Sequence, residues 1–89
     1  YAFRLEVWLA VVLLPLGYWL GENAVEKVLL IIPIFLVLII EMINSAIEAV
    51  VDRVGTEHHE LSGFAKDVAS AAVLISLIIF LVTWIIILL

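Results

Sequence analysis

Three carboxylates fall on one face of a single apolar segment of this 89-residue chain. Glu41, Glu48 and Asp52 are separated by seven and four residues, which on an α-helix brings their side chains within about 40° of one another. Asn44 and Ser45 flank them. No base stands within this stripe, so the acids need a cation, a proton or water to offset their repulsion. Oxygen ligands of this kind suit Mg²⁺, which commonly binds one or two carboxylates together with substrate phosphates.

The position of Glu41 favours a working role over a structural one. It follows thirteen uncharged residues, and an ionisable group inside a membrane segment costs about 2.5–3.5 kcal/mol and normally faces the interior of a bundle. Asp52 and Arg53 are explained equally well as an ordinary solvated helix end at the lipid headgroups.

Other polar residues carry weaker indications. His58 and His59 lack a third metal ligand at helical spacing, so a solvated loop is favoured over a metal site, with nucleotide contact as the alternative. On spacing alone, Lys66 and Asp67 favour a snorkelling pair of side chains at the membrane interface over a phosphate contact. The sequence has no phosphate-binding glycine loop and no arguable Ser-His-Asp set. Any phosphate chemistry would therefore depend on Mg²⁺ held by carboxylates.

The composition requires lipid around the elements that position these groups. Hydrophobic residues make up 67% of the chain and the mean hydropathy is +1.38, against about 45–50% apolar residues in soluble domains. A water-soluble chain this short buries too small a fraction of its surface to hide them. The net charge of −5 argues against nucleic acid, which favours a basic surface.

Three apolar runs separated by short polar segments predict an all-α membrane protein with three spanning helices. We expect one domain over 1–89, with helices at about 3–20, 25–52 and 63–89. The three tryptophans stand near the ends of these runs, as in interfacial aromatic belts.

The helix starts have local markers, and the bases predict an orientation. Asn23 and Glu26 predict an N-cap pair for the second helix, and Ser62 predicts the cap of the third. Three of the four bases fall on one side of the membrane and Lys27 on the other. Because positive charge gathers on the cytoplasmic side, we expect the N-terminus and the loop 52–67 to be cytoplasmic.

Two stretches of the sequence resemble the prokaryotic diacylglycerol kinase family. They are Glu41-x-x-Asn44-Ser45-Ala46-x-Glu48 and Ala65-Lys66-Asp67-x-x-Ser70. The resemblance implies a homotrimer with three transmembrane helices per subunit and shared active sites, in the bacterial inner membrane. It implies transfer of the γ-phosphate of Mg·ATP to diacylglycerol, giving phosphatidic acid.

The resemblance also implies roles for individual residues. Glu41 is similar in position to the general base and Glu48 to the Mg²⁺ ligand that also contacts ATP, with Asn44 and Asp52 in support. The nucleotide contacts implied are Glu48, Glu57, His58, His59, Lys66 and Asp67. The lipid contacts implied are Ala2, Phe3, Arg4, Glu6, Lys27, Glu41, Ser70 and Trp84. Lys27 stands where the family often has arginine, and His58 where it often has an aromatic residue. The family's N-terminal amphipathic surface helix, with a second metal-binding acid, is not found in this sequence, so we expect low activity from it.

Alternatives remain at this point. Undecaprenol kinases of the same family share the catalytic face, so the lipid acceptor stays open. A small proton-coupled transporter would use Glu41 as an intramembrane acid, although the stripe lies towards one end of its helix. A purely structural membrane subunit would have no need of Glu41.

Overall fold

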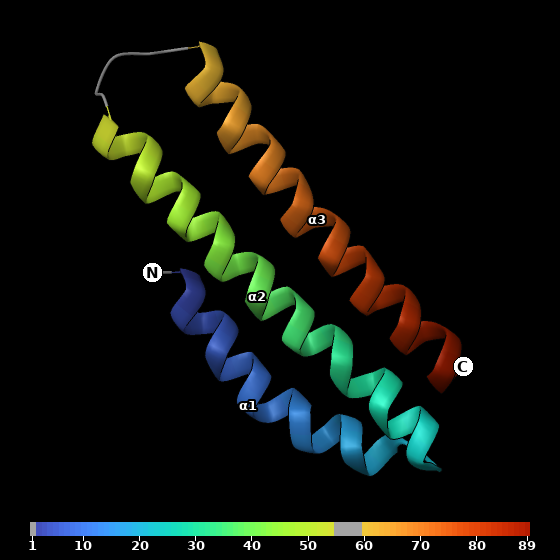
Figure 1. The fold of residues 1–89 in the computed structure, drawn as a ribbon. Coiled ribbons are helices and arrows are strands. Elements are labelled where there is room, and N and C mark those ends of the chain that lie inside the picture. The colour runs from blue at the N-terminus through green and yellow to red at the C-terminus, as the bar shows by residue number, and fades with distance from the viewer. Residues whose placement is uncertain (1, 55–59) are drawn as a thin grey trace.

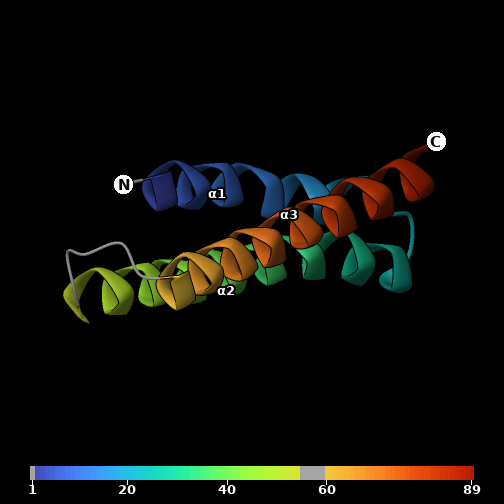
Figure 2. The same cartoon turned by 90° about the horizontal axis from the view of Figure 1, so that it is seen from above.

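Three long helices make up the protein in the computed structural model, which describes residues 2–54 and 60–89. They are α1 (Ala2–Leu20), α2 (Ala24–Val54) and α3 (Glu60–Leu88). Figure 1 shows that each helix runs antiparallel to the one before it, with α2 in the middle. α2 packs against both neighbours, whereas α1 and α3 barely touch each other, and the view from above in Figure 2 shows α1 lying to one side of the α2–α3 pair.

The start of α2 is fixed by the predicted cap pair. The Glu26 N–H donates to Oδ1 of Asn23 at 2.9 Å, and the Glu22 N–H donates to Oε1 of Glu26 at 3.0 Å. Both bonds satisfy backbone donors that a helix start leaves without partners. The turn before it needs glycine, because a Cβ at Gly21 would lie 2.7 Å from the backbone nitrogen of Lys27. The prediction for Asn23 and Glu26 is confirmed.

The start of α3 differs from the prediction. The helix begins at Glu60 rather than at 63, so Ser62 lies inside its first turn and is not the cap. The negative charge of Glu60 in this turn is favourable at the positive end of the helix dipole. α2 likewise continues to Val54, two residues beyond the expected 52, with Arg53 in its last turn, where a positive charge is favourable.

One tryptophan joins all three helices near the turn between α1 and α2. The indole Nε1 of Trp84 donates to the carbonyl of Leu30 at 2.9 Å. The ring also lies on α1, where a Cβ added at Gly17 would be 3.4 Å from Cζ2 of Trp84. Its neighbour on α3 is Phe80, with ring centroids 5.2 Å apart. The α1 backbone thus approaches the indole so closely that a Cβ at position 17 would come into van der Waals contact with the ring.

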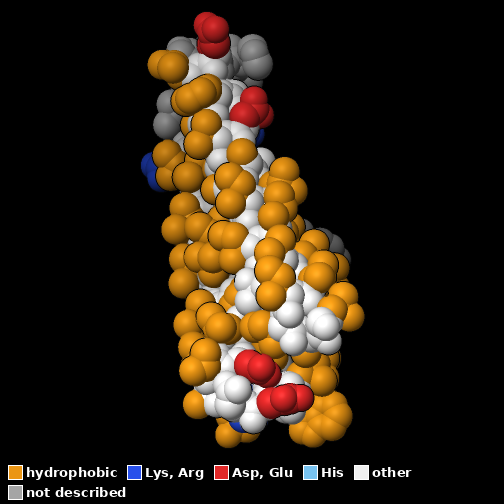
Figure 3. Space-filling view, turned by 90° about the vertical axis from the view of Figure 1, so that its right-hand side faces the viewer, with side chains coloured by type: hydrophobic (Ala, Val, Ile, Leu, Met, Phe, Trp, Pro, Cys, Tyr) orange, Lys and Arg blue, Asp and Glu red, His pale blue; other side chains and the backbone are white. Residues whose placement is uncertain are grey.

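The surface of this fold is mostly apolar. α2 and α3 are long and apolar enough to cross a membrane, while the apolar stretch of α1, Leu5–Leu20, is shorter. Most large hydrophobic side chains are exposed, and the buried hydrophobic residues are few: Ala10, Leu30, Ile34, Val37 and Ala69. On the face in Figure 3, hydrophobic side chains cover the length between acidic groups at the two ends. Such a surface belongs in lipid, so this is a membrane protein.

Candidate active site

The polar stripe of α2 is organised by a hydrogen bond between two of its members. Nδ2 of Asn44 donates to Oε1 of Glu48 at 3.3 Å, one helical turn along. Glu48 is exposed and Asn44 half-buried. Oε2 of Glu48 has no hydrogen-bond partner among the described residues, so the amide orients the carboxylate and leaves one oxygen available to a ligand.

α1 adds a further carboxylate, which the periodicity of α2 cannot show. The first turns of α1 lie beside the middle of α2 (Figure 1). There, the negative charges of Glu6 and Glu48 both act on the half-buried carboxylate of Glu41. We call Glu6, Glu41 and Glu48 the acidic cluster. Because like charges repel one another, most of all where water is scarce, the acidic cluster favours a bound cation.

The acidic cluster does not form a complete metal site. Within residues 2–54 and 60–89, no three carboxylates or imidazoles lie close enough together to hold a metal ion. A cation on Glu48 would therefore take its remaining ligands from water or from a substrate. This arrangement is typical of Mg²⁺, which keeps several waters and is bound by one or two carboxylates plus phosphates.

α3 supplies a cation at the end of the stripe. Nζ of Lys66 lies 2.6 Å from Oδ1 of Asp52, and the two side chains are 41% and 66% exposed. The charge of Glu48 also acts on the Lys66 ammonium. The ion-pair partner of Lys66 is therefore Asp52 on α2, and not its neighbour Asp67. Asp67 and Ser70 are exposed on α3.

Two apolar pockets border the stripe. One is a groove of about 420 Å³ between α2 and α3, where Oδ1 of Asn44 is buried without a partner among the described atoms. The other, about 100 Å³, lies among the three helices, and Glu6 is its one charged lining residue. Leu13, Val37 and Phe80 are among its apolar walls. Both pockets suit hydrocarbon, and each has a polar group from the site at its edge.

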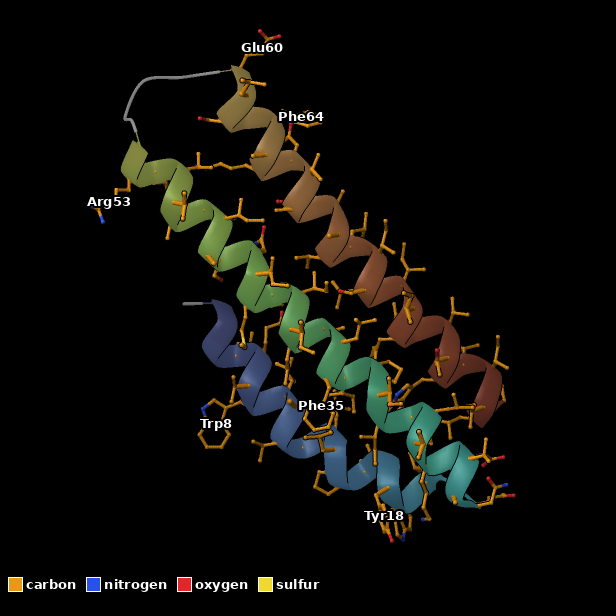
Figure 4. All side chains as sticks on the ribbon, in the orientation of Figure 1. Trp8, Tyr18, Phe35, Arg53, Glu60 and Phe64 are labelled. Carbon is orange, nitrogen blue, oxygen red and sulfur yellow. The ribbon has the colours of Figure 1, made fainter. Side chains whose placement is uncertain are left out.

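Two of the implied lipid contacts lie away from the acidic cluster. Lys27 places Nζ 4.1 Å from the centroid of the Tyr18 ring and donates to the Tyr18 carbonyl. Glu41 lies fourteen positions further along α2, about 21 Å along the helix. Trp84 lies at the same end, on Leu30. Figure 4 shows Tyr18 at this end and Arg53 and Glu60 at the opposite one.

Several of the implied contacts fall outside the part of the chain that the structure describes. Glu57, His58 and His59 belong to the segment between Val54 and Glu60, outside the described residues. Ala2, Phe3 and Arg4 belong to the first turn of α1, but only their backbone is described. The roles implied for these six residues stay predictions.

Comparison with known proteins points in one direction. The model of a family described as prokaryotic diacylglycerol kinase matches residues 1–88. A diacylglycerol kinase of Escherichia coli K12 is 53% identical over 87 residues, covering 98% of this chain and 71% of that protein. One from Haemophilus influenzae is 53% identical over 83 residues, covering 93% and 70%, and one from Pseudomonas aeruginosa is 50% identical over 83 residues, covering 93% and 68%.

Proposed function

The chain belongs to the prokaryotic diacylglycerol kinase family, and on this premise we propose that it transfers the γ-phosphate of Mg·ATP to the free hydroxyl of diacylglycerol. The family and enzyme class predicted from the sequence are confirmed, since relatives from several bacteria are diacylglycerol kinases. The observation that carries the proposal for this chain is that two acids on one face of α2, the half-buried Glu41 and the oriented Glu48, have a lysine from α3 at the end of the same face.

The nucleotide binds at the water-side end of the stripe. Glu48, oriented by Asn44, would hold Mg²⁺, and the fit rests on its available carboxylate oxygen and on the excess of negative charge around it. When bound, Mg²⁺ neutralises charge on the transferring phosphate. Lys66, on which the charge of Glu48 acts, binds the phosphates as a compact positive charge.

The lipid hydroxyl binds deeper along the same face. Glu41 lies two turns from Glu48, about 10 Å along the helix, and is half-buried beside Glu6. The adjoining pocket among the three helices is apolar apart from Glu6, so it suits the hydrocarbon of a lipid whose hydroxyl reaches the acids.

The transfer itself needs little beyond positioning and charge neutralisation. Glu41 accepts the proton of the lipid hydroxyl as its oxygen attacks the γ-phosphorus. The bond from that phosphorus to the bridging oxygen breaks, and ADP leaves with the bond's electron pair. The products are phosphatidic acid and ADP. Lys66 holds the phosphates in line during this exchange.

The working unit is a homotrimer with shared sites in the bacterial inner membrane. Exposed apolar side chains on α1 and α3 leave broad surfaces for neighbouring helices, and the acidic cluster of one chain lacks a complete set of metal ligands among the described residues. All three helices cross the membrane, α1 with its shorter apolar stretch. The N-terminus and the loop 52–67 face the cytoplasm, where ATP is available.

The test is ATP consumption in bilayers or mixed micelles containing the purified chain. ADP release should depend on added diacylglycerol and Mg²⁺, with stoichiometric formation of phosphatidic acid. If undecaprenol supports ADP release and diacylglycerol does not, the chain is an undecaprenol kinase. ADP release that does not depend on either lipid, or no ADP release from a verified oligomer, would contradict a lipid kinase. Either result would favour proton-coupled transport instead.

A further inference from the structure

Asp52 and Lys66 form the one ion pair among the described side chains. The pair connects the last turns of α2 to the second turn of α3, and its oxygen–nitrogen distance is 2.6 Å. Both side chains are substantially exposed. Since solvent-exposed ion pairs contribute little to stability, holding the two helices together is a weak explanation for this contact.

The place of the pair suggests a different role. Asp52 follows Glu48 by four residues, so their side chains neighbour each other on one face of α2. The Lys66 ammonium therefore lies beside the carboxylate that would hold Mg²⁺, and the charge of Glu48 acts on it. A free lysine side chain samples many rotamers, and ordering it at the moment of binding weakens affinity.

We propose that Asp52 is a positioning residue that holds the Lys66 ammonium beside Glu48 before the nucleotide arrives. The inference rests on the proposed function, because it takes Lys66 as a ligand of the nucleotide phosphates. An exposed pair is weak enough to be exchanged, and a phosphate carries more negative charge than one carboxylate. Lys66 thus leaves Asp52 for the phosphates when Mg·ATP binds, and Asp52 acts only through Lys66.

An ordering role for Asp52 and a simple electrostatic role change the KM for Mg·ATP in opposite directions. If Asp52 were only a negative charge near the site, it would repel ATP, and Asp52→Asn would lower the KM for Mg·ATP. If Asp52 orders Lys66, the same substitution raises that KM. The kcat should change little, because Lys66 is already on the phosphates in the bound complex.

The experiment compares Asp52→Asn with two reference variants of the full chain in bilayers. Asp52→Asn should raise the KM for Mg·ATP about three- to tenfold, the usual cost of ordering one long side chain. Asp52→Glu keeps the charge and should stay within about twofold of the parent. Glu60→Gln removes an exposed acid that forms no ion pair within the described residues, and it should leave the KM unchanged.

A double-mutant cycle isolates the pair and does not depend on turnover. Affinity for a fluorescent ATP analogue is measured by titration in the parent, Asp52→Asn, Lys66→Ala and the double variant. Asp52→Asn should weaken binding in the parent and have no effect once Lys66 is alanine. An unchanged or stronger affinity in Asp52→Asn, equal losses in Asp52→Glu and Asp52→Asn, or the same loss without Lys66 would each overturn the proposal. Failure of the proposed lipid kinase function is distinguishable from these outcomes, because the parent chain would then consume no ATP in the presence of diacylglycerol.

Discussion

Asn44 holds Glu48 from one helical turn away: its amide nitrogen lies 3.3 Å from Oε1 of that carboxylate. The amide oxygen, Oδ1 of Asn44, is buried and has no hydrogen-bond partner among the described atoms. Asn44 thus lies between the proposed metal ligand Glu48 and the apolar groove between α2 and α3.

Asn44→Ala should raise the Mg²⁺ concentration needed for half-maximal activity. The substitution removes the donor that orients Glu48, and losing such a partner of a metal ligand typically costs about 10- to 100-fold in metal affinity or activity. A magnesium titration of the initial rate checks this. Ser45→Ala, at the next and exposed position, is the matched control, and equal effects of the two changes would count against an orienting role.

Glu41→Gln and Glu48→Gln should fail in different ways. Loss of a general base lowers kcat by about 10²- to 10⁴-fold while Mg·ATP still binds, the pattern expected of a group that acts in the transition state. Loss of a carboxylate ligand weakens the binding of Mg·ATP itself. Nucleotide titrations beside steady-state kinetics separate the two. Intact turnover with weakened nucleotide binding in Glu41→Gln would remove Glu41 as the base.

Inactive chains should complement one another when mixed. We expect Glu6→Gln, on α1, and Glu48→Gln, on α2, each to be poorly active alone. If Glu6 acts at the site of a neighbouring subunit, and not only at the acidic cluster of its own chain, verified mixed oligomers contain some sites with both acids intact and recover part of the activity. Mixed oligomers that stay as inactive as their parents would indicate sites contained within one chain.

Trp84→Phe should destabilise the fold without leaving a large cavity at position 84. The change removes the indole N–H that donates to Leu30 at 2.9 Å but keeps an aromatic ring. Interhelical hydrogen bonds in membrane proteins average about 0.6 kcal/mol, with a maximum of about 1.7, and we expect a loss in that range on unfolding in detergent. Trp8→Phe, at a side chain that is 69% exposed, should change the stability by less.

Two glycines should respond oppositely to alanine. At Gly17 the nearest atom to an added Cβ is 3.4 Å away, and alanine in a helix interior is favoured over glycine by about 0.8–1 kcal/mol, so Gly17→Ala should be neutral or stabilising. At Gly21 the added Cβ would lie 2.7 Å from the Lys27 backbone, and Gly21→Ala should cost about 1–3 kcal/mol. Thermal unfolding of both variants in one detergent tests the contrast.

Residues close in sequence predicted one helix start correctly and another incorrectly. The cap of α2 depends on Asn23 and Glu26, which lie three residues apart, and it was predicted correctly. The start of α3 was placed too late because Ser62 looked like a cap, whereas the helix begins at Glu60.

The geometry of the candidate site was predictable only in part. One helical periodicity was enough to place Glu41 and Glu48 on one face of α2. Nothing in that periodicity could bring Glu6 from α1 to them, or pair Lys66 with an aspartate fourteen residues away in the chain. Only the resemblance named Glu6 and Lys66 as site residues, and only the structure shows which groups they meet.

α2 runs without interruption from Ala24 to Val54. On such a helix the position of a side chain along the axis and its direction around the axis change together, whereas a site built on loops can change each separately. Each residue along the helix moves a side chain about 1.5 Å deeper and turns it by about 100°. The distance along the helix between Glu41 and Glu48 is thus fixed. It can change only by whole helical turns if both acids are to stay on the same face. A chain of this architecture could meet a hydroxyl at another depth by tilting α2 or by shifting an acid through whole turns, but not by inserting or deleting a single residue between the two acids.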